Sequence, residues 1–372
     1  MIPYGKQHIY SDDIKAVVNV LKSAWLTQGP KVQEFEKALA SASGVKYAVT
    51  VSNGTAALHL AYLAADLGKG DEVITTPNTF AATTNMLLDV GAKPVFSDIR
   101  LDTNNINEKD IKRRITKRTK TIVPVHFAGH PCDMRVINNI AKKKKILVIA
   151  DACHALGATY LGKPVGAWAD MSVYSFHPVK SITTGEGGAV VTNSKTFYER
   201  LLHLRNHGIH KDAKGKNVMT ELGYNYRMTD IQAALGISQL LKLKLFTQKR
   251  HQVVRWYKEA LAGIKEIILP IELKDIYSAW HLYIIRVRNA FERDDLVSFL
   301  KERGVGVNFH YPAVYRHPYY SKHGYSSIAL KNADIYHNTT ITLPCFPGLS
   351  KKDVVYVARA IKDFFDGHKY GN

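Results

Sequence analysis

The chain has 372 residues, enough for two domains of ordinary size, and its 46% hydrophobic and 22% charged residues are typical of a folded globular protein. No stretch approaches 18 consecutive apolar residues, and the first residues lack a basic-then-apolar leader, so we expect neither a membrane span nor a signal peptide. Three scattered cysteines exclude a disulfide framework, and we expect a protein of the reducing cytoplasm.

The chain carries a large excess of positive charge, with 51 Lys and Arg residues against 32 Asp and Glu residues and a formal net charge of +19. Such a balance is typical of proteins that bind nucleic acid, anionic lipid or phosphorylated small molecules. The densest basic run, at 142–145, follows an apolar-periodic stretch and suits the C-terminal end of a helix. Because no basic region has interleaved aromatic residues, we expect no nucleic acid and favour a nucleotide-linked substrate.

In chain order, the first predicted element is an amphipathic helix capped by Ser11, Asp12 and Asp13. Short β-rich runs then alternate with segments of helical periodicity. Nearly continuous apolar strands separated by helices predict an α/β fold with a mostly parallel central sheet flanked by helices, and ligands of such sheets bind beyond the carboxyl ends of the strands. The predicted strands are 47–51, 72–75, 94–97, 121–125, 147–150, 171–174 and 189–192.

The pattern changes near residue 245. The elements predicted after this point are a long charged helix through Trp256, β-rich runs at 281–287 and 305–309, and helices over 294–302 and 351–365. We therefore predict a large domain over residues 1–245 and a smaller α+β domain over residues 246–372.

A turn of small residues, Ser-Asn-Gly-Thr-Ala-Ala at 52–57, follows the first predicted strand and opens a helical pattern. Backbone N–H groups at the start of a helix lie where its dipole is positive, and Thr55 adds a hydroxyl, so this turn can bind an anion such as a phosphate. Taken alone, the motif is more often an ordinary N-cap with a turn glycine.

Two ionisable side chains follow buried strands. Asp151 closes the apolar run 147–150, where a carboxylate is unfavourable unless an N-cap, a salt bridge or the protonated ring nitrogen of a cofactor satisfies it. Lys180 follows the strand at 171–174 and lies among hydroxyls and glycines. A desolvated lysine loses its proton more easily and becomes a nucleophilic amine, although a surface lysine is the common alternative in a basic chain.

A phosphate-binding turn, a carboxylate for a ring nitrogen and an amine for an aldehyde together define a site for pyridoxal phosphate (PLP), and Phe80 supplies a flat face for stacking. His203, His207 and His210 have a helix-like spacing that zinc ligands also show, but no carboxylate supports them in the nearby sequence. We expect no metal.

The sequence resembles the DegT/DnrJ/EryC1/StrS family of sugar aminotransferases, a branch of the fold type I PLP-dependent transferases, essentially from end to end. The resemblance implies the fold type I architecture and a homodimer with shared active sites. It is carried by Ser-Phe-His-Pro-Val-Lys at 175–180, Thr-Thr-Gly-Glu-Gly-Gly at 183–188, Gly-His-Pro-Cys-Asp-Met at 129–134, Arg-Asn-His-Gly at 205–208 and Gly-Tyr-Asn-Tyr-Arg-Met at 223–228.

The resemblance also implies residue roles. Lys180 would form the Schiff base and move the proton, and Asp151 would hold the pyridine nitrogen. The other cofactor contacts would be Gly54, Thr55, Phe80, His154, Ser175 and, from the neighbouring subunit, Asn225. The sugar-nucleotide contacts would be Tyr4 of the N-terminal segment, Ala24, Trp25, Leu26, Thr27, His310, Tyr311, Pro312 and Ala313.

Within the family, the resemblance is strongest to the branch that aminates a UDP-sugar in pseudaminic acid biosynthesis. It implies transfer of the amino group of L-glutamate, which leaves as 2-oxoglutarate, to C4 of UDP-2-acetamido-2,6-dideoxy-β-L-arabino-hex-4-ulose. Amination of a D-configured 4-keto sugar, of the legionaminic acid or bacillosamine type, stays open, as does a non-catalytic PLP-binding or nucleic-acid-binding regulator. Family members with histidine in place of the lysine carry out dehydration, so Lys180 favours transamination.

Overall fold

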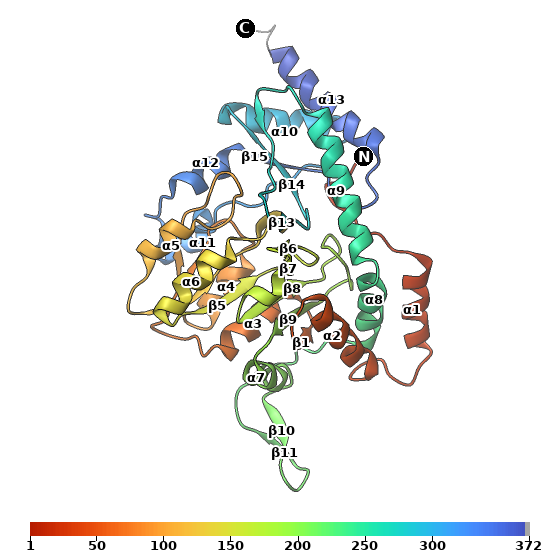
Figure 1. Cartoon of the computed structure of the whole chain (residues 1–372), viewed down its shortest axis with the longest axis vertical. Helices are drawn as coiled ribbons and strands as arrows, with labels where there is room; N and C mark the ends of the chain where they lie inside the picture. Colours follow the sequence, from red (N-terminus) through yellow and green to blue (C-terminus); the bar gives the residue numbers. More distant parts are fainter. Residues whose placement is uncertain (369–372) are drawn as a thin grey trace.

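The computed structural model describes residues 1–368, and a seven-stranded sheet forms its centre (Figure 1). In sheet order, the strands are β1 (Tyr47–Val51), β9 (Gly188–Thr192), β8 (Met171–Ser175), β5 (Leu147–Asp151), β4 (Thr119–Val123), β2 (Glu72–Thr75) and β3 (Lys93–Phe96). The five strands from β8 to β3 are parallel, whereas β9 is antiparallel to both of its neighbours. The predicted α/β fold with a mostly parallel sheet is confirmed.

Each of the seven strands predicted before residue 245 is present in the central sheet, with small shifts at the ends. The largest shift is in β4, which begins and ends two residues before the predicted run 121–125. Pro124 has no N–H group to donate to a neighbouring strand, so the regular ladder stops before it. Val125 beyond it forms only an isolated bridge with Asp151.

Helices cover both faces of the sheet, because the strand side chains are apolar on both faces. Val49, Val51 and Val190 pack in one cluster with helices α3 (Gly54–Ala64), α4 (Ala82–Asp89) and α7 (Lys195–Arg205). The alternate residues of the same strands, Ala48 and Val191 among them, pack on the opposite face. That face is covered by α2 (Pro30–Ala42), α5 (Glu108–Arg114), α6 (Met134–Lys144) and α8 (Asp230–Leu240).

The first helix, α1 (Ser11–Leu21), differs from its prediction in one detail. Ser11 is the first helical residue rather than the cap, and the cap position is Tyr10. The carboxylate of Asp13 accepts a hydrogen bond from the backbone N–H of Tyr10 at 2.8 Å and another from the side-chain amide Nε2 of Gln239 at 2.7 Å. Asp13 therefore both closes the first turn of α1 and fixes the helix to α8.

The C-terminal part follows α9 (Leu243–Ala260), which runs from beside α8 toward α13 (Lys351–His368) (Figure 1). Its sheet is antiparallel, with β12 (Ile267–Ile268), β14 (Tyr283–Val287) and β15 (Thr340–Leu343), and α10 (Arg293–Glu302) and α13 pack against it. The predicted strand at 305–309 is not formed, and this segment makes only isolated bridges to Ile2 and Thr342. The predicted domain boundary at residue 245 lies within the first turn of α9.

The remaining elements are short. β6 (Thr159–Tyr160) and β7 (Lys163–Pro164) form a small sheet with β13 (Ile276–Tyr277), and β10 (Ile209–Lys211) and β11 (Asn217–Met219) form a hairpin that projects from the lower end of the molecule in Figure 1. α11 (Pro318–Tyr320) and α12 (Lys331–Thr339) belong to a C-terminal segment that packs against Phe96 and Phe127 of the large sheet region. This packing brings residues 310–311 over the ends of the central strands. Among residues 1–368, no helix has the length and apolar character needed to cross a membrane.

Candidate active site

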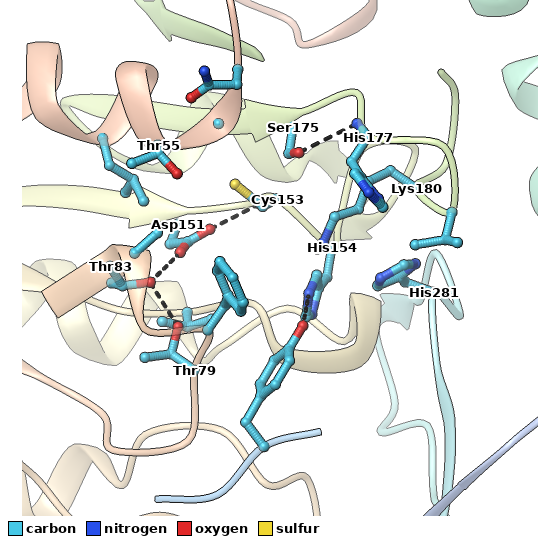
Figure 2. Close-up of a pocket in the computed structure, with 18 of the residues that line it drawn as sticks. Thr55, Thr79, Thr83, Asp151, Cys153, His154, Ser175, His177, Lys180 and His281 are labelled. Atoms are coloured by element: carbon cyan, nitrogen blue, oxygen red, sulfur yellow. Dashed lines mark hydrogen bonds between the residues drawn. The ribbon is translucent and has the colours of Figure 1, made fainter. Parts of the chain in front are cut away.

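A cavity of about 670 Å³ lies at the carboxyl ends of the parallel strands, where the sequence predicts a ligand site (Figure 2). Most of the side chains and turns that enclose it lie at or just after the ends of β1, β2, β5 and β8. Tyr4 near the N-terminus and His310 and Tyr311 of the C-terminal part also line it. The predicted residues that line it are Tyr4, Gly54, Thr55, Phe80, Asp151, His154, Ser175, Lys180, His310 and Tyr311.

The predicted phosphate-binding turn is the start of α3. The side chain of Asn53 caps the helix by accepting the backbone N–H of Ala56 at 2.8 Å. Within residues 1–368, the N–H groups of Gly54 and Thr55 have no acceptor, and they lie where the helix dipole is positive. A Cβ atom at Gly54 would lie 2.9 Å from Cβ of Ser175, so glycine allows this close approach. The turn is therefore both an N-cap and an open anion site.

Asp151 ends β5 and is buried at the floor of the cavity. Its Oδ2 accepts the hydroxyl of Thr83 at 2.7 Å, and its Oδ1 accepts the backbone N–H of Cys153 at 3.0 Å (Figure 2). Thr79 in turn lies 2.7 Å from the hydroxyl of Thr83. In the described part of the chain, no Lys, Arg or His nitrogen lies within 4.0 Å of this carboxylate, so the salt-bridge alternative is wrong.

Lys180 follows β8 in a loop that folds back onto β9. The backbone N–H of Lys180 donates to the carbonyl of His177 at 2.9 Å, and the backbone N–H of Phe176 donates to the carbonyl of Gly187 at 2.8 Å. No residue in the range 1–368 forms a hydrogen bond with Nζ of Lys180. Burial lowers the pKa of Lys180, against the opposing effects of Cys153 and Asp151, which favours a neutral amine facing the cavity.

His154 and Tyr311 form the wall opposite the phosphate-binding turn. Nδ1 of His154 accepts the backbone N–H of Ala128 at 3.3 Å, which places the ring proton on Nε2, 3.2 Å from the hydroxyl of Tyr311. Burial lowers the pKa of His154 well below its usual value, and it lowers the pKa of His310 to about 4. Both imidazoles are therefore neutral near pH 7 and act as hydrogen-bonding groups rather than charges.

Several residues of the cavity wall are absent from the sequence prediction. His281 precedes β14, is buried, and lies with its ring centroid 4.4 Å from that of His154. Thr83 and Cys153 contact Asp151, and Tyr226 lies near the phosphate-binding turn. Tyr226 is part of the motif at 223–228 and Cys153 adjoins Asp151, but no sequence pattern singles out His281.

Other predicted contacts lie outside this cavity. In a single chain, Trp25, Leu26 and Asn225 do not line the cavity. All three are exposed, Trp25 to 56% and Leu26 to 48%. Ala24, Thr27 and Pro312 do not line it either. Ala313 is buried in an apolar cluster with Phe127 and Tyr315.

The three histidines at helix-like spacing serve other contacts. Nε2 of His203 lies 3.0 Å from the hydroxyl of Thr220, and the rings of His203 and His210 lie 5.8 Å apart. Over residues 1–368, no group of three or more His, Cys, Asp or Glu side chains is arranged to hold a metal ion.

His126, which follows β4, is expected to make the protein less stable in acid. Its backbone N–H donates to the carbonyl of Asp151 at 3.0 Å, its Nδ1 accepts the N–H of Cys132 at 3.0 Å, and burial lowers its pKa from 6.5 to about 3. Between these two pH values the unfolded state binds one more proton than the folded state. The free energy of unfolding should therefore fall by about 1.4 kcal/mol for each pH unit of acidification from this group alone.

Urea unfolding between pH 6.5 and pH 4 measures this dependence. In His126→Asn, where the amide oxygen can still accept the N–H of Cys132, the slope should decrease by the contribution of one proton. An unchanged slope in this variant would contradict the assignment to His126.

A cofactor with a phosphate, a basic ring nitrogen and an aldehyde would find a matching group at each of three places: the start of α3, the buried carboxylate and the desolvated amine. This design is that of the PLP-dependent transferases. The chain belongs to the DegT/DnrJ/EryC1/StrS aminotransferase family, whose model matches residues 7–362.

Three proteins illustrate the similarity. The chain is 42% identical over 377 residues to the UDP-4-amino-4,6-dideoxy-N-acetyl-β-L-altrosamine transaminase of Campylobacter jejuni. The match covers 100% of this chain and 99% of the relative. PseC of Helicobacter pylori, an aminotransferase of pseudaminic acid biosynthesis, superposes with a TM-score of 0.94 at 34% identity and covers 98% and 99% of the two chains. Spr1654 of Streptococcus pneumoniae, solved in a PLP form, superposes with a TM-score of 0.93 at 31% identity. The match covers 98% of this chain and 99% of Spr1654. The predictions of family and fold are confirmed.

Proposed function

We propose that this aminotransferase moves the amino group of L-glutamate to C4 of UDP-2-acetamido-2,6-dideoxy-β-L-arabino-hex-4-ulose, the reaction of pseudaminic acid biosynthesis. The observation that carries the proposal is the 42% identity, over the whole chain, to a transaminase named for the product of this reaction. The similarity to PseC supports the same substrate class. In addition to these two similarities, the chain has both Lys180 and Asp151 in one cavity.

The cavity fits PLP, the cofactor of this family. The N–H groups of Gly54 and Thr55 and the hydroxyl of Ser175 would hold the phosphate, Asp151 would hold the ring nitrogen, and Phe80 would cover one ring face. The fit rests on two features of this chain: a buried carboxylate with only neutral donors around it, and backbone N–H groups without acceptors. When bound, PLP supplies an aldehyde that accepts an amino group and a ring that withdraws electrons from the reacting carbon.

The residues of the chain then have separate tasks. Nζ of Lys180, whose pKa is lowered by burial, would accept a proton from the carbon that carries the amino group and return it to the carbon that held the cofactor's aldehyde. The carboxylate of Asp151 would face the ring nitrogen, and Thr83 and the N–H of Cys153 fix its orientation. His154, through Nε2, orients the hydroxyl of Tyr311, which can donate a hydrogen bond into the cavity without adding charge.

We also propose that two copies of the chain complete each site. Trp25 and Leu26 are large apolar side chains that stand half exposed, and the segment 24–27 lies beside the residues that follow Asn225, through a bridge between Thr27 and Thr229. A second copy of the chain would bury these apolar side chains and bring Asn225 to the phosphate of its partner's cofactor. This arrangement would account for the predicted contacts at 24–27 and Asn225, which lie outside the cavity of one chain.

The substrate is tested with the purified protein, PLP, L-glutamate and two UDP-4-keto sugars that differ in configuration at C5. We expect release of 2-oxoglutarate in equal amount to the amino sugar and a kcat/KM for the L-arabino sugar at least about tenfold above that for the D-configured sugar. NMR spectroscopy of the product gives the configuration at C4 and C5. Preference for the D-configured sugar would assign the chain to the legionaminic acid or bacillosamine type, and no 2-oxoglutarate with either sugar would contradict the proposal.

A further inference from the structure

A buried arginine behind the cavity contacts the loop that carries the lysine. Arg250 lies on α9 and is 2% exposed, yet in the described part of the chain no Asp or Glu side chain pairs with it. Burying a guanidinium without a carboxylate partner is unfavourable, because the charge loses its hydration. The packing of α9 alone therefore does not explain why a charged side chain occupies this buried position.

The partners of Arg250 are backbone carbonyls from separate segments. Its Nη1 donates to Cys345 at 2.7 Å and to His281 at 3.1 Å, and its Nη2 donates to Val179 at 3.3 Å. Val179 directly precedes Lys180, whereas His281 lies just before β14 and Cys345 just after β15 of the smaller sheet. One side chain therefore joins the loop of the lysine to the C-terminal part of the chain.

Arg250 also acts on the lysine through its charge. The charged and titratable groups that act on Lys180 are Asp151, Cys153, His154, His281, His310 and Arg250. Burial keeps the three histidines neutral, and the carboxylate of Asp151 favours the protonated amine. Arg250 opposes protonation of the lysine. Burial lowers the pKa of Arg250 as well, but a guanidinium starts from so high a value that it keeps its charge near neutral pH.

We propose that Arg250 is a positioning residue for Lys180: its guanidinium holds the backbone before the lysine against the smaller sheet and places a fixed positive charge behind the amine. This inference rests on the proposed role of Lys180. A neutral side chain at this position would leave the amine protonated to a higher pH, so less of it would be able to accept a proton from the substrate.

The test is the pH dependence of acetic anhydride labelling of Lys180 in the full-length chain freed of cofactor, measured by mass spectrometry of its peptide. In the wild-type protein, Lys180 should react with a lower pH midpoint than exposed lysines such as Lys195. In Arg250→Met the midpoint should rise above the wild-type value, so that labelling at a fixed pH below it is severalfold slower. Arg250→Lys keeps the charge and should keep the midpoint near that of the wild type.

Arg286→Met is the matched control. Arg286 is partly buried and donates to the backbone carbonyl of Leu101 at 3.2 Å, but it does not act on Lys180, so its removal should leave the midpoint in place. Three results would overturn the proposal: a wild-type Lys180 that titrates like the exposed lysines, an unchanged midpoint in Arg250→Met, or an equal rise in Arg250→Met and Arg250→Lys.

Two choices keep the outcome decisive. If Arg250→Met does not fold, Arg250→Gln, which keeps an N–H donor without the charge, replaces it, and an unchanged midpoint in that variant would likewise overturn the proposal. The assay contains no amino donor and no sugar, so its result is independent of whether the chain transfers amino groups to the proposed substrate.

Discussion

Replacing Lys180 with alanine is expected to lower the turnover number for amino transfer by about 10⁴-fold or more. The amine has two tasks, as the nucleophile that meets the cofactor's aldehyde and as the base that moves the proton, and proton transfer by a positioned group alone contributes about 10² to 10⁴-fold. No hydrogen bond within residues 1–368 engages Nζ, so its removal breaks no contact that supports the fold. The loss should therefore fall on turnover, with little change in thermal unfolding.

Three measurements separate this chemistry from a structural effect. Borohydride treatment of the wild-type protein with PLP should fix the mass of the cofactor on the peptide that contains residue 180, and the variant should show no such addition. A small primary amine in solution should restore part of the turnover of Lys180→Ala. Lys195→Ala, at an exposed position on α7, should retain wild-type turnover. Turnover of Lys180→Ala above a tenth of the wild-type value would refute the assignment.

Replacing Asp151 with asparagine is expected to lower kcat by about 10² to 10³-fold while the protein stays folded. The amide has nearly the shape of the carboxylate, and its oxygen can still accept the N–H of Cys153. It lacks the negative charge that keeps a ring nitrogen protonated, and one adjacent opposite charge shifts such an equilibrium by about one to three pKa units. The absorbance of the bound cofactor, followed against pH, should show that the variant loses the ring proton at lower pH than the wild type.

Asp133→Asn is the matched control for this substitution. The carboxylate of Asp133 also accepts one backbone N–H, from Val136 at 3.1 Å, and one hydroxyl, from Tyr160 at 2.6 Å, but it lies outside the cavity. Its kcat should stay within about twofold of the wild type. If Asp151→Asn also stays within this range, the carboxylate does not have the proposed role.

The predictions that depended on the ends of the strands were the most successful. Asp151 and Ser175 are the last residues of two strands of the central sheet, and the turn at Gly54 follows a third. The carboxyl ends of parallel strands meet at one edge. Position along the chain therefore already gave the approximate location of these groups in space. The same reasoning placed Lys180 near them, because its loop leaves β8 and returns at once to β9.

Contacts between distant segments had no comparable signal. Tyr311 reaches the cavity because the segment with α12 packs on Phe127, and His281 reaches it because β14 lies beside the central sheet. Hydrophobic periodicity predicts neither arrangement. The same holds for Arg250, whose acceptors are carbonyls that every residue carries.

The sequence alone thus determined the kind of fold, the family and the groups that follow each strand, because strand periodicity and strand ends are local properties of the chain. Only the tertiary structure decided which polar groups surround Asp151, which histidines are buried and neutral, and which predicted contacts lie outside the cavity of one chain. Burial and hydrogen bonding depend on residues that are far apart in the sequence, and these were set when the helices and the C-terminal segment packed against the central sheet.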